Sequence, residues 1–577
     1  MASRSRLPLA VPLAVLLASA SVTSAQDRIE SAPRPAPRPG VPSTGPRDGP
    51  PGGVEGQTTG TARISGRVVR GDTGAPLRGA VVRVVGEGLD EPRSTTTEPD
   101  GRYELGELPA GRFFVSATKG SYVSITHGQR RAAEQGRPIE LDGRQHVANV
   151  NFSLPRGSVI TGRITDEFGE PVAHLAVSAM QYRYFGGRRQ LFPAERDATD
   201  DRGQYRIFGL PPGDYYVSAS AEGVTFGMAS AGREGVAPTY YPGTPALSEA
   251  ERVQLRVGEE NASVSFAVVA ARSVTVSGTV LESSGARARA GFIVVQPDSG
   301  GGPVFTMRGG GMVRPDGTFK IGNLSPGGYM LHVNTGDSPR DDGEYAMVPL
   351  TVGSEDVSGL TVVTSAPSHV TGQIVFETAP PESIRQEEFV FLLRGEDPTA
   401  PMRGTGPISP DESWTFETRA QRSPVFVQTV RMPDGWGLKA VLHGGVDVTD
   451  SGIEFRVGNP VEGVQLVISN RFAAVTGSVA TSDGRAAADY TVVVLPDDPN
   501  RWRPRSRYIA TARPSQRGTF EIARLPAGRY LAAAVDYLEQ GQHTDAEYLE
   551  LLRGYATPFE LRDGERRTLK LELVTVN

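Results

Sequence analysis

The feature that most constrains this chain is a strand pattern, apolar-x-Gly-x-apolar, which recurs along the sequence. Its central glycines are Gly66, Gly162, Gly278, Gly372 and Gly477. Because side chains alternate between the two faces of a strand, each glycine shares the inward face with its apolar neighbours. At such a place the missing side chain lets another backbone or a bulky residue approach closely. A unit repeated in this way predicts tandem β-modules.

Each unit also carries two aromatic residues ten positions apart. The pairs are Tyr103/Phe113, Tyr205/Tyr215, Phe319/Tyr329, Phe416/Phe426 and Phe520/Tyr530. In four units the first aromatic follows a turn glycine, such as Gly101, which we expect to take a positive φ, and its ring should point inward. A Leu-Pro-x-Gly type of turn separates the pair in the same four units. The fourth unit has Arg422-Ser423-Pro424 instead, which predicts a longer or distorted hairpin there.

The fold class expected from these repeats is all-β. With 69 glycines and 45 prolines the chain is broken too often for long helices, and 577 residues require several cores. About seven strands per unit indicate a Greek-key sandwich. We expect five tandem Greek-key β-sandwich modules, the fourth of them divergent. Their expected bounds are 61–154, 155–271, 272–366, 367–469 and 470–577.

The N-terminus predicts export. Residues 1–25 combine basic residues, a short apolar run and a small-residue stretch, as in a signal peptide. Cleavage after Ala25 is the first choice and after Ala20 the second. Residues 26–60 are rich in proline and glycine and predict a disordered linker.

The expected location follows from this export signal and from what the chain lacks. The apolar run is too short to span a membrane, so we expect no transmembrane helix. The chain has no cysteine, which favours a bacterial envelope. The expected location is the periplasm, the outer cell surface or the extracellular space.

The first unit carries the clearest family resemblance. Its segments ISGRVVRGDTGAPLRGAVVRVVG and DGRYELGELPAGRFF resemble the carboxypeptidase regulatory-like domain, a transthyretin-like β-sandwich. The second unit matches well, the third and fifth mainly in their second halves, and the fourth poorly. The resemblance implies accessory modules, which in the family accompany metallocarboxypeptidase domains, transporter N-termini and repetitive surface proteins. Related sandwiches bind carbohydrate, an association that rests on fold alone.

The sequence offers no catalytic constellation. None of the seven histidines stands in a His-x-x-Glu or His-Glu-x-x-His pattern, and neither a nucleophile elbow nor a phosphate-binding glycine loop occurs. The turn aspartates Asp100, Asp201 and Asp316 lack a calcium-loop pattern, and we expect them to hydrogen-bond their own turns. We therefore expect no enzyme, no metal and no cofactor. A net charge of -6 spread along the chain predicts no nucleic-acid binding.

One helix is expected, in the last unit, from Asp545 to Gly554. Asp545 would cap its start, and Tyr548, Leu551 and Leu552 would share one face that packs on the same sandwich. His543 beside it is interpreted as a surface histidine.

Four segments rich in arginine and aromatic residues are candidate ligand-binding sites. Such side chains stack on sugar rings or contact acidic groups and partner proteins. The candidates are Tyr182, Tyr184, Phe185, Arg188, Arg189, Tyr240, Tyr241, Phe305, Arg308, Arg501, Trp502, Arg503 and Tyr508. In the alternative interpretation these segments are hairpin extensions that pack on their own or the next module.

The leading functional hypothesis is a non-enzymatic exported protein whose modules form a binding array for polysaccharide or envelope proteins. The alternative is a structural spacer or adhesion scaffold with no small ligand. A metal-dependent hydrolase is a distant third, which would need two histidines and a carboxylate brought together by the fold.

Overall fold

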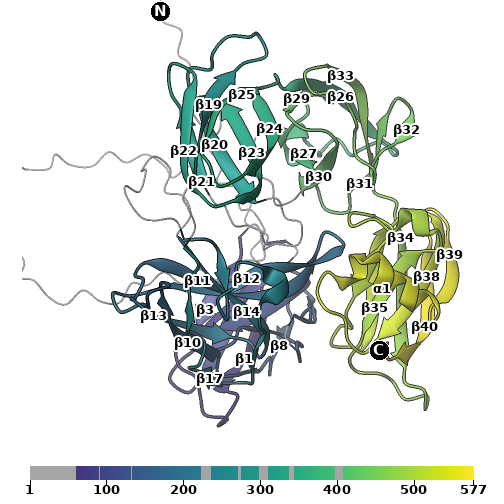
Figure 1. Ribbon diagram of the computed structural model, residues 1–577. Coiled ribbons are helices and arrows are strands. Elements are labelled where there is room, and N and C mark those ends of the chain that lie inside the picture. Colours follow the sequence, from purple (N-terminus) through teal and green to yellow (C-terminus); the bar gives the residue numbers. More distant parts are fainter. Residues whose placement is uncertain are drawn as a thin grey trace, which may run out of the picture. The chain divides into compact units, whose positions relative to one another are not determined.

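The computed structural model describes residues 60–86, 88–89, 91–131, 133–221, 236–270, 274–297, 309–336, 343–396 and 407–576. The chain separates into a unit of residues 1–59 and a unit from Gly60 to Asn577 (Figure 1). The predicted signal peptide and nearly all of the predicted linker lie outside the described residues. We refer to the five expected ranges of the second unit as modules 1 to 5.

Module 1 is a β-sandwich. Its buried cluster takes Ile64 and Val68 from one sheet and Val82 and Val84 from the other. The first sheet consists of β4 (Arg102–Leu108), β1 (Ala62–Arg70), β8 (His146–Val147) and β9 (Phe152–Leu154). The second consists of β3 (Arg93–Thr96), β2 (Val81–Gly86), β5 (Gly111–Thr118), β6 (Ile125–Thr126) and β7 (Ile139–Leu141).

Module 2 repeats this plan with a longer hairpin. One sheet contains β13 (Gln204–Leu210), β10 (Ser158–Thr165), β17 (Glu260–Asn261) and β18 (Phe266–Ala267). The other contains β12 (Arg188–Ala198), β11 (Leu175–Phe185), β14 (Gly213–Ala221), β15 (Thr239–Tyr240) and β16 (Val253–Leu255), with the 3-10 turn η1 (Leu247–Glu249) nearby in sequence.

Module 3 has two smaller sheets around a cluster of its own. They are β22 (Thr318–Leu324), β19 (Val274–Leu281) and β25 (Val357–Val363), and β21 (Gly309–Val313), β20 (Gly291–Pro297), β23 (Gly327–Thr335) and β24 (Tyr345–Val352).

In module 4 the strands are divided between the two sheets differently from modules 1 to 3. Its larger sheet is β29 (Thr415–Ala420), β26 (Ser368–Phe376), β33 (Val461–Ser469), β31 (Gly437–His443) and β32 (Val446–Asp447). Its smaller sheet is β28 (Pro407–Ile408), β27 (Val390–Gly395) and β30 (Val425–Arg431), and η2 (Gln386–Glu388) precedes it.

In module 5 one strand joins both halves into a seven-stranded sheet. The strands are β36 (Ala510–Ala512), β35 (Thr491–Pro496), β38 (Gly528–Val535), β40 (Arg566–Val574), β34 (Ala473–Ala480) and β37 (Thr519–Leu525), with β39 (Thr557–Leu561) beside β38. The 3-10 turns are η3 (Pro499–Arg501) and η4 (Gln542–Thr544). The all-β fold class is thus confirmed, while the number of modules and their boundaries stay predictions.

Each repeated glycine lies on the first strand of its module. At that glycine, the backbone near the module's last strand passes close to the first strand. A Cβ on Gly66 would be 2.0 Å from the carbonyl oxygen of Val150, and one on Gly278 would be 1.9 Å from that of Leu360. The other three glycines have the same relationship with Val264, Val464 and Leu569. Because a Cβ never approaches an oxygen so closely, only glycine fits. The close backbone approach expected from the sequence is confirmed.

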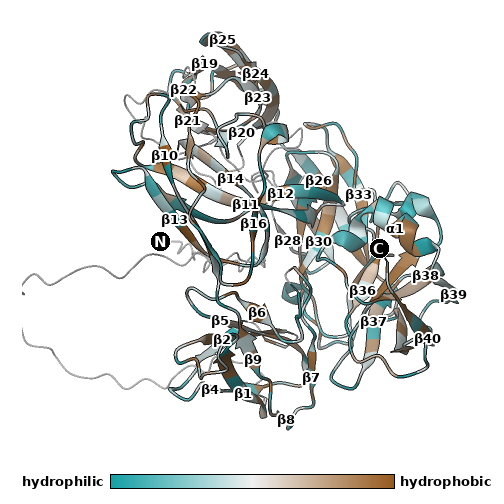
Figure 2. Cartoon of the chain, turned by 60° about the horizontal axis from the view of Figure 1, so that its bottom comes forward, coloured by the Kyte–Doolittle hydropathy of each residue, from teal (hydrophilic) through white to brown (hydrophobic). Residues whose placement is uncertain are grey.

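The first aromatic of every pair is buried, as expected, and Figure 2 shows the alternation of hydrophobic and hydrophilic residues along the strands. The four turn glycines that precede these aromatics have positive φ. In module 4 Trp414 takes the place of that glycine with a φ of 61°, and its ring lies 4.6 Å from that of Phe376. The second aromatic is buried in four modules, whereas in module 4 Val425 is buried and Phe426 is only half-buried.

The expected helix is α1 (Ala546–Arg553). The Asp545 carboxylate caps it by accepting a hydrogen bond of 2.9 Å from the amide of Glu547. Tyr548, Leu549 and Leu552 are buried against Val493 and other residues of the same module, so packing on its own sandwich is confirmed. The prediction for Leu551 was wrong, because this side chain points outward and is 56% exposed.

Candidate functional site

The first candidate segment is a continuous β-hairpin. Strands β11 and β12 pair as far as Phe185 and Arg188, and the turn between them consists of Gly186 and Gly187 with φ of 59° and 77°. Two glycines at positive φ are typical of a two-residue turn whose twist matches the strands. The Tyr182 ring lies edge-on to the Tyr216 ring, with 5.7 Å between their centres. The Arg189 guanidinium lies 5.6 Å above the Tyr182 ring.

The tip of this hairpin meets module 5. A Cβ on Gly187 would lie 2.8 Å from the Pro504 Cγ and 2.9 Å from the Thr544 carbonyl oxygen, while one on Gly541 would lie 2.5 Å from the Tyr184 carbonyl oxygen. Burial raises the pKa of Tyr184, and the nearby Asp545 carboxylate adds to the rise. The segment therefore serves as packing surface at Tyr184.

The remaining candidates of module 2 divide into buried and exposed side chains. Phe185 packs edge-on against Phe192 at 5.4 Å, and Arg188 is exposed beside it. Tyr240 is buried beside Met180 and Leu191. Tyr241 is half-buried, with its ring 6.0 Å from that of Phe266.

The candidates of module 5 mostly face their own module. Trp502 is half-buried, and its Nε1 donates a hydrogen bond of 2.9 Å to the carbonyl of Pro496. Tyr508 lies 6.1 Å from Tyr530, and the Arg501 guanidinium lies 4.6 Å above the Tyr508 ring. Arg503 is exposed. Phe305 and Arg308 lie outside the described residues.

Two arginines of the same loop, absent from the candidates, reach module 4. Arg507 lies between two aspartates: its Nε is 3.2 Å from Asp450, its amide donates to Asp450 at 2.9 Å, and its Nη2 pairs with Asp447. Arg505 lies 4.9 Å above the ring of Phe426 and donates a hydrogen bond to the carbonyl of Glu396. The four arginines at alternate positions from 501 to 507 could have indicated a contact surface from the sequence. The residues that Arg505 and Arg507 contact, however, are distant in sequence.

The charged groups at this contact change one another's pKa values. Burial opposes ionisation of Asp447, yet hydrogen bonds from Thr449 and Arg507 outweigh it and lower the pKa of Asp447. At Asp450 burial prevails and raises the pKa. Burial also opposes the charge of Arg507, but the hydrogen bond to Asp447 and the two carboxylates keep the pKa of Arg507 above its ordinary value. We call Arg507, Asp447 and Asp450 the arginine joint.

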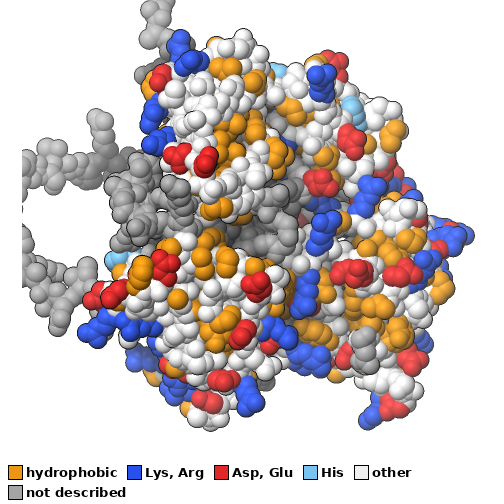
Figure 3. All heavy atoms as spheres, viewed as in Figure 1, with side chains coloured by type: hydrophobic (Ala, Val, Ile, Leu, Met, Phe, Trp, Pro, Cys, Tyr) orange, Lys and Arg blue, Asp and Glu red, His pale blue; other side chains and the backbone are white. Residues whose placement is uncertain are grey.

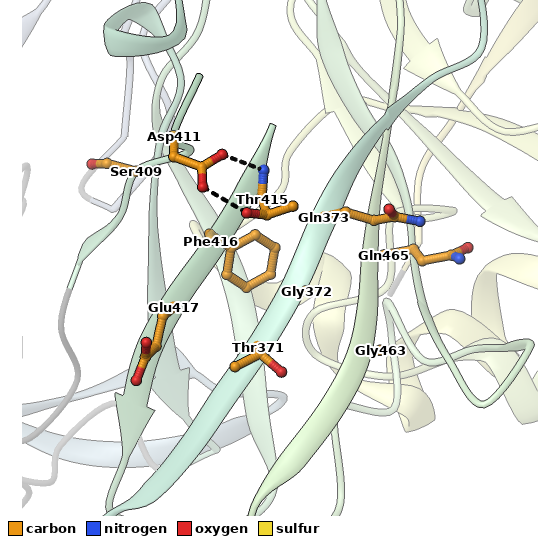
Figure 4. A pocket seen from close by; sticks show the side chains of 10 residues that line it. All are labelled: Thr371, Gly372, Gln373, Ser409, Asp411, Thr415, Phe416, Glu417, Gly463 and Gln465. Atoms are coloured by element: carbon orange, nitrogen blue, oxygen red, sulfur yellow. Dashed lines mark hydrogen bonds between the residues drawn. The ribbon is translucent and has the colours of Figure 1, made fainter. Parts of the chain in front are cut away.

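A polar hollow of about 720 Å³ lies on the outer face of module 4, where no candidate had been placed. Its floor is formed by β29, β26 and β33, and Figure 4 shows Gln373 and Gln465 side by side on neighbouring strands. Asp411 at its rim accepts hydrogen bonds from the amide and the hydroxyl of Thr415, at 2.9 and 2.7 Å. Phe416, the aromatic of this hollow, is buried in the sandwich core.

A second hollow, of about 410 Å³, occupies the corresponding face of module 5. The Thr-Gly-x and Thr-Phe-Glu segments line both hollows, at Thr371 and Thr415 in module 4 and at Thr476 and Thr519 in module 5. These recurring segments are the signal from which both hollows could have been found. Hydroxyl, amide and carboxylate groups can hydrogen-bond a polar ligand, but neither hollow presents an exposed aromatic platform.

The turn aspartates were predicted correctly in two of three cases. Asp100 accepts from the amide of Arg102 at 3.1 Å, and Asp316 accepts from the amide of Thr318 at 3.0 Å. In module 2 the prediction was wrong, because Asp200, and not Asp201, accepts from the amides of Arg202 and Gln204.

Among the described residues, no group of three or more His, Asp or Glu side chains is placed to hold a metal ion. The same part of the chain contains no helix long and apolar enough to cross a membrane. On the face shown in Figure 3, acidic and basic side chains are interspersed.

Two segments of the chain, residues 63–155 and 159–231, match the family of the carboxypeptidase regulatory-like domain. The resemblance inferred for the first two units is thereby confirmed. No curated protein matches the chain.

Three bacterial proteins are among the solved structures that are similar to this chain. The TIE protein of Bacillus anthracis is 10% identical, with 68% of each chain covered and a TM-score of 0.16. A Streptococcal ancillary pilin is 12% identical, over 52% of this chain and 98% of its own, at 0.21. The minor pilin GBS52 of Streptococcus agalactiae is 13% identical, over 36% and 95%, at 0.19. TM-scores this low do not extend any property of those proteins to this chain.

Proposed function

We propose that the protein is a non-enzymatic, exported scaffold whose β-sandwich modules are joined by its arginine and aromatic loops. This is the structural or adhesion alternative, and it locates the protein at the bacterial envelope or outside the cell. The arginine joint is the observation that carries the proposal. A loop whose arginines are engaged by the neighbouring module holds modules together.

The arginine joint has the properties of a structural contact. The Arg507 and Asp450 side chains are each only 20% exposed, so their ion pair is screened less by solvent than a surface pair. Lys439 adds a second bridge between modules 4 and 5, since its Nζ lies 2.9 Å from Asp563 and 2.5 Å from Glu377. Hydrogen bonds from lysine and serine lower the pKa of Glu377.

The family match supports a non-catalytic function. The resemblance implies that domains of the regulatory-like type are accessory modules, and the matched residues, 63–155 and 159–231, lie in modules 1 and 2. Modules 3 to 5 likewise have buried apolar cores enclosed by strands.

Limited proteolysis of the full chain tests the scaffold proposal. Arg507→Met should accelerate cleavage between modules 4 and 5, near Arg471, because the joint loses its charged centre. Arg503→Met is the matched control in the same loop, since Arg503 is exposed, and it should leave the cleavage rate unchanged. Equal cleavage of Arg507→Met and the parent protein would remove the support for the scaffold.

Carbohydrate binding is the second candidate, supported by the hollow of module 4. Gln373 and Gln465 are register partners on adjacent parallel strands and present two amides to the same side. A glycan array with the parent chain, Gln373→Ala, Tyr184→Ala and Trp502→Ala separates the hollow from the aromatic loops. Saturable binding lost in Gln373→Ala favours the hollow, loss in Tyr184→Ala or Trp502→Ala favours the loops, and no saturable binding rejects both.

A further inference from the structure

The loop between β6 and β7 of module 1 makes contacts far outside its own module. We call its described residues, 127–131 and 133–138, the strap. Its Ala133 carbonyl accepts a hydrogen bond of 2.8 Å from the amide of Gln540 in module 5, and Arg131 lies 4.8 Å above the ring of Tyr537. The strap thus lies along the segment that precedes η4.

The centre of this contact is a buried ion cluster. Nη1 of Arg513 lies 2.7 Å from the Glu134 carboxylate, and both side chains are only 1% exposed. The same guanidinium pairs with Asp489, and its Nη1 donates to the carbonyl of Gln135 at 2.8 Å. Arg130 of the strap lies 2.6 Å from Asp489. Because a guanidinium stays charged, burial at this depth requires such partners.

Reciprocal hydrogen bonds flank the cluster. Arg137 donates to the carbonyls of Pro514 and Ser515, at 3.2 and 2.8 Å. The Glu140 amide donates to the Gln516 side chain at 3.1 Å, and that side chain donates back to the Glu140 carbonyl at 2.7 Å. The strap with β7 and the β36–β37 connection, which are distant in sequence, therefore form a continuous interface.

We propose that the strap is a clasp that locks module 1 onto module 5 and closes the chain between its first and last modules. A chain closed in this way cannot behave as a fully extended string of modules. The clasp rests on the contact of Arg513 with Glu134, whereas the scaffold proposal rests on the arginine joint, so either proposal can fail without the other.

Arg513 also has a carboxylate partner within its own module. Asp489 belongs to module 5 and stays with Arg513 when the strap departs, while Glu134 and Arg130 leave together and regain water. Each guanidinium would therefore keep one carboxylate partner after separation, Arg513 with Asp489 and Arg130 with Glu134.

The absence of native cysteines allows a direct test by crosslinking. The full chain with Glu140→Cys and Gln516→Cys, treated at high dilution with a short bismaleimide, should form an intrachain crosslink that keeps modules 1 and 5 joined after proteolysis. The single-cysteine variants give the background. A yield no higher than this background would overturn the clasp.

The ion cluster is tested in the same two-cysteine background. Arg513→Met should lower the crosslink yield several-fold, and Arg485→Met, whose parent side chain is 84% exposed and pairs with Asp483 of its own module, should not. Should Arg513→Met fail to fold, Glu134→Gln on the strap provides the same comparison and should also lower the yield. Unchanged yields in folded Arg513→Met or Glu134→Gln would refute the cluster as the lock.

Discussion

The hydroxyl of Tyr103 donates a hydrogen bond of 2.6 Å to the carbonyl of Val150, the same carbonyl that excludes a Cβ from Gly66. Tyr205 makes an identical bond to Val264 in module 2. Modules 3 to 5 have phenylalanine at this position and lack the bond. The missing side chain of the glycine lets the carbonyl approach, and the tyrosine hydroxyl donates a hydrogen bond to that carbonyl.

Removing that hydroxyl should destabilise module 1. Tyr103→Phe keeps the ring but leaves the Val150 carbonyl without this donor, and we expect a loss of about 1 kcal/mol. Tyr555→Phe is the control, since this tyrosine is exposed and its change should have no measurable effect. Denaturant unfolding followed by near-UV circular dichroism measures both. Equal midpoints for the two variants would contradict the assignment.

A methyl group on the glycine strand should be more damaging. Gly66→Ala drives a Cβ into backbone, which a side-chain shift cannot relieve, and we expect a loss of about 3 kcal/mol, the upper end for overpacking. Gly106→Ala is the matched change in the same module, because nothing lies within 4 Å of its Cβ. That variant should be neutral or more stable by up to about 1 kcal/mol. The melting temperature of Gly66→Ala should therefore fall well below that of the parent protein, whereas the melting temperature of Gly106→Ala should be unchanged or higher.

The helix offers a comparison of adjacent positions. Leu549→Ala empties a fully buried site and should cost about 2–5 kcal/mol, whereas Leu551→Ala alters an exposed side chain and should stay within about 0.5 kcal/mol. Thermal unfolding of both variants decides the point. A larger loss for Leu551→Ala would show that the helix packs through the other face.

Stability should fall as the pH drops below about 6.5, the ordinary histidine pKa. Burial lowers the pKa of His543, which is half-buried and not the surface histidine expected from the sequence, and burial with the nearby Arg137 lowers the pKa of His127. Each histidine therefore binds a proton more readily in the unfolded chain than in the folded one, so acidification through this range favours unfolding. The melting temperature should be lower at pH 5.5 than at pH 7.5.

Substitution identifies the groups responsible for this pH dependence. The double variant His127→Gln/His543→Gln should show a smaller decrease between the two pH values. His146→Gln changes an exposed histidine and serves as the control, with the full decrease expected. If the double variant kept the full decrease, other groups would have to be responsible.

Features set by local periodicity could be predicted from the sequence. The inward glycines and aromatics follow from a period of two and recur in every module. The helix was found from its cap, but its short length left the buried face ambiguous, and Leu549 was missed. The aspartate of the module 2 turn was misplaced by one position because Asp200 and Asp201 are adjacent.

Contacts between modules could not be predicted in this way. Arg507 and Asp447, or Arg513 and Glu134, are far apart in sequence, and no local pattern states which charges will meet. The arginine-rich loop of module 5 therefore looked like a ligand site, although Arg507 lies against module 4. The shallow hollows went unnoticed because short polar residues on an outer sheet face are ordinary.

The central claim, that this loop joins modules, is tested most directly by amide hydrogen exchange on the full chain. Asp447→Ala/Asp450→Ala changes only module 4, and the account predicts faster exchange in peptides covering residues 499–509 of module 5, where the Arg507 amide loses its acceptor. Peptides covering β35 should be unaffected. Unchanged exchange across residues 499–509 would contradict the account.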